Sequence, residues 1–299
     1  MGGMNVAWKN GELAERESLL LPVVAHAVQS GFVVTEDIPC FAGEEAGIRV
    51  VFRAKDHVTS FLRSAKACMM DVPYGADKLR AAILSVAEAC EDTPAFVRLM
   101  AYCENEQAYD SEFVVVTCVP FAHRKQEASS ERVDAVVSSW RQPSADSLPP
   151  QFGLAASRAV AEFALQEARS RGCAEAFLLN EQGCVCEATS GCVFAVRDGV
   201  LASPPASEGL FDSVMRDAVF SLAIDLEIPI VEECVTRADL YRAHEVFVAG
   251  DTAGVVPVAS VDGREIEAPG PITKAISERL GLIAQNALPE YADWLTIIE

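Results

Sequence analysis

Apolar side chains recur at helical spacing in five segments of the chain. The clearest stripe predicts a helix at 57–70, with Asp56 as its N-cap. Another predicted helix has Ser157 as its cap and ends before Gly172. The remaining three are expected at 75–90, at about 213–226 and at about 272–287.

Strands are predicted where apolar and polar side chains alternate. The opening residues predict a hairpin that turns at Asn10–Gly11, a pair that suits a tight turn. Further strands are expected at 112–119, 174–179, 192–201 and 245–250, the third of which folds back at Asp198–Gly199. Strands and helices mixed in this order predict an α+β fold.

The chain is predicted to form two domains. Residues 124–134 are rich in Lys, Glu and Ser and have no apolar period, so they predict an interdomain linker. A small N-terminal α/β domain is expected at 1–123, and a large C-terminal domain at 135–299. At 299 residues the chain is long enough for both.

Composition and charge exclude several classes of partner. The chain is 51% hydrophobic and carries a formal net charge of −20, so its surface repels nucleic acid and anionic lipid. The longest apolar stretch, 18–28, is too short to span a bilayer, and no basic region precedes it. We therefore expect a cytoplasmic protein that binds neither nucleic acid nor a membrane.

The cysteines and histidines predict no metal site. Ten cysteines are scattered through predicted strands and helices, and in a cytoplasmic chain we expect them to be reduced and mostly buried as small hydrophobes. Cys184 and Cys186 form a CxC pair, which is a weak metal signal, and the four histidines lie far apart in the sequence.

Several stretches resemble the class IV aminotransferases, which include branched-chain aminotransferase, D-amino-acid aminotransferase and aminodeoxychorismate lyase. The stretches, in family order, are VVFRAKDHVTSFLRSAK (50–66), SSWRQPSADSLPPQFGLAASRAVAEFALQEARSRGCAEAFLL (138–179), CEATSGCVFAVRDGVLASPP (186–205) and HEVFVAGDTAGVVPVASVDGREI (244–266). The resemblance implies a two-domain fold of fold-type IV, with a pyridoxal phosphate (PLP) pocket between the domains, and a homodimer.

The family's Schiff-base lysine has no counterpart in this alignment. A gap-free alignment places the lysine position on Gly153, and a shift of three residues places Pro150 there. Neither side chain has an amine. The alignment is anchored on Trp140, Pro149, Glu167–Ala168 and Gly172.

The resemblance also implies a weakened phosphate site. Ser60 stands where the family has an arginine, and Arg63 lies close to one helical turn further on. Val214 and Met215 occupy a turn whose amides cradle the phosphate, and Asp251 replaces a threonine there. A unit charge pair at about 4 Å, with an effective dielectric of about 20, is worth about 4 kcal/mol. We therefore expect no PLP and no other cofactor.

Two carboxylates are the candidate acid/base groups. Glu187 corresponds to the family's partner of the pyridinium nitrogen, and in an empty pocket its pKa should rise. Alternatively, Glu187 pairs with Arg158, which replaces a tyrosine and restores positive charge. Asp251 is the second candidate acid or base, unless it only caps a turn.

Five further residues are candidates for substrate binding. Arg98 matches an arginine that some members use for the substrate carboxylate, but a surface salt bridge would also explain it. Cys192 is either a nucleophile or an inert buried thiol. The other three candidates are Glu36, Phe96 and Thr252.

The sequence favours a PLP-independent enzyme on this scaffold. It would act by acid/base catalysis on a small amino acid, an oxo acid or a related conjugate, which would suit secondary metabolism. Two alternatives stay open: a noncatalytic protein that binds a ligand or partner, and a PLP-dependent aminotransferase or lyase with an atypical site.

Overall fold

The computed structural model describes residues 5–43, 48–90, 96–104, 114–121 and 132–298. The chain divides into two compact units. The first contains 1–124, 152–156 and 282–299, and the second contains 125–151 and 157–281. Most of the predicted linker lies outside the described residues, so the predicted domain boundaries stay a prediction.

One antiparallel sheet forms the centre of the first unit. Its order is β16-β4-β3-β5-β6-β1-β2. The predicted opening hairpin is confirmed, with positive φ at both Asn10 and Gly11. The strands are β1 (Val6–Lys9), β2 (Glu12–Glu15), β3 (Val33–Ala42), β4 (Arg49–Phe52), β5 (Phe96–Cys103), β6 (Val114–Phe121) and β16 (Leu295–Ile298).

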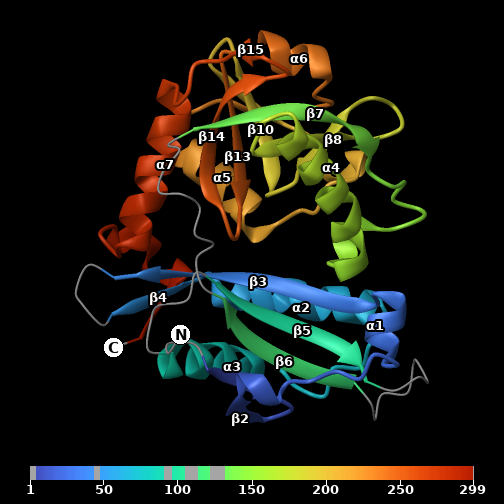
Figure 1. Ribbon diagram of the computed structural model, residues 1–299. Helices are drawn as coiled ribbons and strands as arrows, with labels where there is room; N and C mark the ends of the chain where they lie inside the picture. The colour runs from blue at the N-terminus through green and yellow to red at the C-terminus, as the bar shows by residue number, and fades with distance from the viewer. Residues whose placement is uncertain (1–4, 44–47, 91–95, 105–113, 122–131, 299) are drawn as a thin grey trace. The chain divides into compact units, whose positions relative to one another are not determined.

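The helices of the first unit are α1 (His26–Ser30), α2 (Ala54–Ala67) and α3 (Ala76–Ala89). Helix α2 packs against β3 and α3, and Figure 1 shows α2 and α3 beside the strands. Val58, Phe61 and Ala65 are buried along α2, as their spacing predicts.

A mixed sheet forms the centre of the second unit. Its order is β12-β11-β10-β13-β14-β7-β8-β9, with β15 beside β14. Strand β7 runs parallel to both β8 and β14. The strands are β7 (Val133–Arg141), β8 (Glu175–Leu179), β9 (Val185–Ala188), β10 (Cys192–Arg197), β11 (Val200–Ser203), β12 (Ile230–Glu232), β13 (Glu245–Gly250), β14 (Gly254–Val261) and β15 (Arg264–Glu265).

The remaining helices are α4 (Arg158–Ser170), α5 (Val214–Asp225), α6 (Arg237–Arg242) and α7 (Pro271–Ala284). Helix α4 packs on β7 and β8, and α5 packs on β13. The boundary between the units falls within α7. Short 3-10 turns occur at η1 (Arg16–Ser18), η3 (Pro150–Phe152), η4 (Ala155–Ser157), η5 (Ala206–Glu208) and η6 (Pro289–Trp294).

One of the two predicted helix caps is wrong. Helix α2 begins before Asp56, whose carboxylate lies in the first turn and accepts a hydrogen bond from Arg53 at 2.7 Å. A carboxylate is favourable anywhere in a helix's first turn, so the sequence signal did not fix the first residue. Ser157 is the N-cap residue of α4, as predicted, although its side chain makes no capping hydrogen bond.

The cysteines follow the prediction with one exception. Cys184 and Cys234 form a disulfide, which corrects the expectation that all ten are reduced. Their sequence separation of 50 gave no pattern from which to pair them. The other eight are free, and all of these except Cys173 are buried. None of the helices in the described ranges is long and apolar enough to cross a membrane.

Candidate active site

Glu187 is the centre of the candidate site in the second unit. It lies on β9, opposite Leu178 of β8. Burial raises the pKa of Glu187 to about 7, and hydrogen bonds from the main chain of Phe211 and the side chain of Gln142 offset only part of this. The positive charge of Arg158 also lowers it. Near neutral pH this carboxyl group can therefore give or take a proton.

Cys192 lies close to Glu187 but is a poor nucleophile. Its thiol donates to the carbonyl of Phe211 at 3.5 Å and lies 3.7 Å from the Ser213 hydroxyl. Burial raises the pKa of Cys192 to about 12, and the negative charges of Glu187 and Asp251 contribute. The thiol thus stays protonated at neutral pH, as expected of an inert buried cysteine.

The N-terminus of α5 borders the same group of residues. Ser213 caps the helix by accepting a hydrogen bond from the amide of Arg216 at 3.1 Å. The side chains of Val214 and Met215 are buried, so these two residues can offer a ligand only their main chain. Amides in a helix's first turn favour an anion.

Removing the Ser213 cap should destabilise the second unit modestly. We expect Ser213→Ala to lower the free energy of unfolding by about 1 kcal/mol, because one amide of α5 loses its partner. Urea unfolding would measure the change. An unchanged midpoint, equal to that of the exposed Ser207→Ala control, would show that the cap contributes nothing.

Gln142 is a site residue that the sequence did not reveal. It follows β7 directly and is 4% exposed. Its side chain bonds Glu187, yet its Oε1 is buried and finds no hydrogen-bond partner within the described residues. A buried acceptor without a partner costs free energy, so a donor on a bound ligand would stabilise it. A glutamine before a proline carries no sequence signal for such a role.

The structure brings Glu187, Cys192, Asp251 and Arg158 into one electrostatic neighbourhood of the second unit. Thr252 follows Asp251 in an exposed turn after β13. Glu187 and Arg158 interact electrostatically, since the positive charge of Arg158 lowers the pKa of Glu187.

Other candidates lie in the first unit. Glu36 accepts a hydrogen bond from the Ser60 hydroxyl at 3.0 Å and lies 2.8 Å from His57 Nδ1. Both Ser60 and His57 lie on α2. Gly153 also belongs to the first unit, and its carbonyl accepts a hydrogen bond from the amide of Thr35 at 2.9 Å. Pro150, the first residue of η3, belongs to the second unit.

Arg98 makes an internal ion pair rather than an exposed surface one. It binds the carboxylate of Asp37 through two hydrogen bonds of 2.5 and 2.8 Å. Its guanidinium lies 5.3 Å from the ring centre of Phe96 and 5.0 Å from that of Phe121. The guanidinium of Arg98 therefore binds the Asp37 carboxylate in the same two-bond geometry that was predicted for a substrate carboxylate.

Comparisons with known proteins assign the family. The family model for amino-transferase class IV matches residues 47–261. The chain belongs to the class IV aminotransferase family. The branched-chain-amino-acid aminotransferase of Escherichia coli K12 is 31% identical over 280 residues, which cover 91% of this chain and 90% of that protein.

Solved structures confirm the predicted α+β, two-domain fold of this family. The branched-chain aminotransferase of Thermoproteus uzoniensis with norvaline superposes with a TM-score of 0.93 at 33% identity, and both chains are fully covered. The PLP form of the Thermobaculum terrenum enzyme gives a TM-score of 0.91 at 26% identity, again over the full length of both chains.

The expectation of no cofactor is corrected by these comparisons. Full-length structural relatives include a PLP-bound branched-chain aminotransferase, which points to PLP as the cofactor. We inferred loss of the cofactor from the missing amine at Gly153 and from the weakened phosphate site at Ser60 and Asp251. The Schiff base is only one of the interactions that hold PLP in a protein. Contacts to the ring and to the phosphate can remain when the lysine is absent. The correspondence of Gly153 to the lysine stays a prediction.

The raised pKa of Glu187 predicts a pH dependence of stability. In the unfolded chain the group returns towards its ordinary value of 4.5, so between about 4.5 and about 7 the folded state binds more protons. The free energy of unfolding should therefore fall as pH rises through this window, and the contribution should be constant below and above it. Urea unfolding from pH 4 to 8 would measure it, with Glu187→Gln lacking this component. Equal pH dependence in both proteins would contradict the assignment.

Proposed function

We propose that this chain is an enzyme that acts on a small amino acid or its 2-oxo acid, with PLP or its pyridoxamine form held without a covalent bond. The observation that carries this proposal is the carboxyl group of Glu187, whose pKa burial raises to about 7. Arg158 offsets only part of the effect of burial on this group, and a protonated ring nitrogen would add a second positive charge beside it.

The residues of the second unit fit two parts of this cofactor. Glu187 would hold the ring nitrogen, and the buried Oε1 of Gln142 offers an acceptor to a donor beside it. The first-turn amides of α5, at Val214 and Met215, would hold the phosphate.

When bound, the cofactor supplies an electron sink for the carbon next to the amino nitrogen. Glu187 would keep the ring nitrogen protonated, and Arg158 would limit the local negative charge. Asp251 would serve as a second acid or base. We retain Arg98, Phe96 and Glu36 of the first unit as candidates for recognising a substrate. Thr252 of the second unit stays a further candidate.

Turnover of a panel of substrates would test this function. The purified protein would be incubated with added PLP, a branched-chain or other apolar amino acid, and 2-oxoglutarate, and the oxo acid product would be measured. We expect turnover that depends on added PLP and that falls in Arg98→Ala. If the protein bound PLP but converted none of the amino acids, the noncatalytic ligand-binding alternative would be favoured.

We also propose that the protein is a cytoplasmic homodimer that binds a small-molecule substrate or ligand. Light scattering of the full chain would test the oligomeric state. A single species of about the 32.1 kDa mass of one chain would contradict it.

A further inference from the structure

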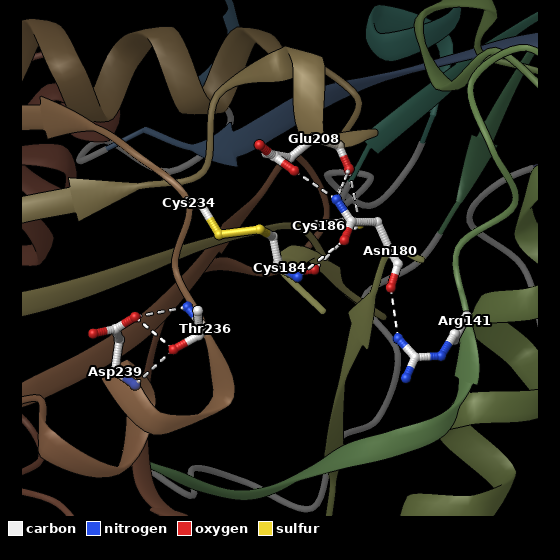
Figure 2. Close-up of a disulfide and its surroundings, with 8 residues drawn as sticks. All are labelled: Arg141, Asn180, Cys184, Cys186, Glu208, Cys234, Thr236 and Asp239. Atoms are coloured by element: carbon white, nitrogen blue, oxygen red, sulfur yellow. Dashed lines mark hydrogen bonds between the residues drawn. A yellow bond between two sulfur atoms is a disulfide. The ribbon is translucent and has the colours of Figure 1, made fainter. Parts of the chain in front are cut away.

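The disulfide of the second unit has one exposed and one buried end. Cys184 precedes β9 and is 8% exposed. Cys234 lies between β12 and α6, and its side chain is exposed. Figure 2 shows the bond joining these two segments, which are 50 residues apart in the sequence. A thiol in solution can therefore reach the sulfur of Cys234 more easily than that of Cys184.

The disulfide holds the beginning of the strand that carries Glu187. The amide of Val185 donates to the carbonyl of Val235 at 2.7 Å, and Cys184 and Thr236 form an isolated antiparallel bridge. Val185 and Val235 are both buried in the core of the second unit. The disulfide therefore holds residues 184–185 against residues 234–236. Glu187 lies three residues after Cys184.

Hydrogen bonds fix the other side of the same segment. The Asn180 side chain accepts from the amide of Cys184 at 2.9 Å and donates to the Glu208 carboxylate at 2.6 Å. The Cys186 thiol donates to the carbonyl of Glu208 at 3.0 Å. In Figure 2, Asn180 lies between Cys184, Glu208 and Arg141. Opening the disulfide would remove one of the two supports of this segment and leave the other.

The charge beside Cys234 permits an anionic thiol to approach. Glu232 and Glu233 precede it, and each is paired with an arginine: Glu232 with Arg216 at 2.6 Å, and Glu233 with Arg197. Their negative charges are therefore partly neutralised. A tripeptide thiol such as glutathione meets less repulsion here than the overall charge of −20 would suggest.

We propose that Cys184–Cys234 is a thiol-exchange site for small thiols, and that its redox state controls how firmly β9 holds Glu187. A thiolate attacks Sγ of Cys234, the S–S bond breaks, and Cys184 leaves as a thiolate that takes up a proton. A second thiolate then attacks the small-molecule sulfur of the mixed disulfide. It releases the oxidised small-molecule disulfide and leaves Cys234 as a thiol. Two small thiols are oxidised, and one protein disulfide is reduced.

The test uses the full chain equilibrated with defined ratios of reduced and oxidised glutathione. Alkylation in denaturant followed by mass spectrometry would count the free thiols and locate them. We expect eight free thiols in oxidising buffer and ten after reduction, with both new ones at Cys184 and Cys234. Ten free thiols in every buffer, or a bond that glutathione never opens, would overturn the proposal.

Hydrogen exchange tests the effect on β9. We expect the amide of Val185 to exchange about tenfold faster, or more, after reduction, because its segment opens locally. Cys173→Ser, which removes a partly exposed free thiol of the same unit, should leave this rate unchanged. Equal rates in oxidised and reduced protein would overturn the link to β9. The proposal relies on the proposed function only for the role of Glu187, and neither readout requires cofactor or substrate.

Discussion

Glu187→Gln is expected to lower turnover by about 100-fold or more, because acid/base groups typically contribute about 10²–10⁴. Glutamine keeps the size of the side chain, but it has one acceptor oxygen instead of two and cannot exchange a proton. In the cofactor-free protein the raised pKa of Glu187 lies near 7, so the affinity of the wild-type protein for PLP should change near this pH, and the variant should lose this change.

The matched control for this variant is Glu181→Gln. Glu181 is an exposed glutamate of the same unit and should tolerate the change with activity intact. Steady-state rates from pH 5 to 9 would compare the three proteins. A Glu187→Gln variant with at least half the wild-type rate at every pH would exclude a proton-transfer role for this residue.

Breaking the disulfide is expected to cost about 2–4 kcal/mol of unfolding free energy. The bond closes a long loop, with a sequence separation of 50, and so restricts the unfolded chain. Cys234→Ser should show the full loss, since its exposed side chain leaves no cavity behind. Urea unfolding without reductant would measure the change.

Cys173→Ser should change this free energy by less than about 0.5 kcal/mol, because Cys173 is a partly exposed free thiol. Reductant should destabilise the wild-type protein and leave Cys234→Ser unaffected. If reductant shifted both proteins equally, the stabilising bond would lie elsewhere.

Local patterns in the sequence predicted most elements of the fold. The stripe of Val58, Phe61 and Ala65 identified α2, and Asn10–Gly11 identified the first hairpin, because these signals arise from residues close together in the chain. Pairings between distant segments left no such signal. Strand β16 pairs with β4, and Cys184 bonds Cys234, across long stretches of chain.

The candidate site was predictable only through the family resemblance. Glu187 was found because it matches a family position, and burial then explains its raised pKa. Its partners Gln142 and Phe211 come from separate segments and have no distinctive residue type, so the sequence could not supply them. The cofactor prediction was wrong because three substituted positions, Gly153, Ser60 and Asp251, were given more weight than the similarity of the rest of the chain to a family that binds PLP.

Binding of pyridoxamine 5′-phosphate, measured by equilibrium dialysis, tests the Glu187 site most directly, because this form needs no Schiff base. Saturable binding to the wild-type protein, weakened about tenfold or more in Glu187→Gln and unchanged in Glu181→Gln, is the predicted result. No saturable binding to the wild-type protein, or equal affinity in all three, would contradict the proposed site.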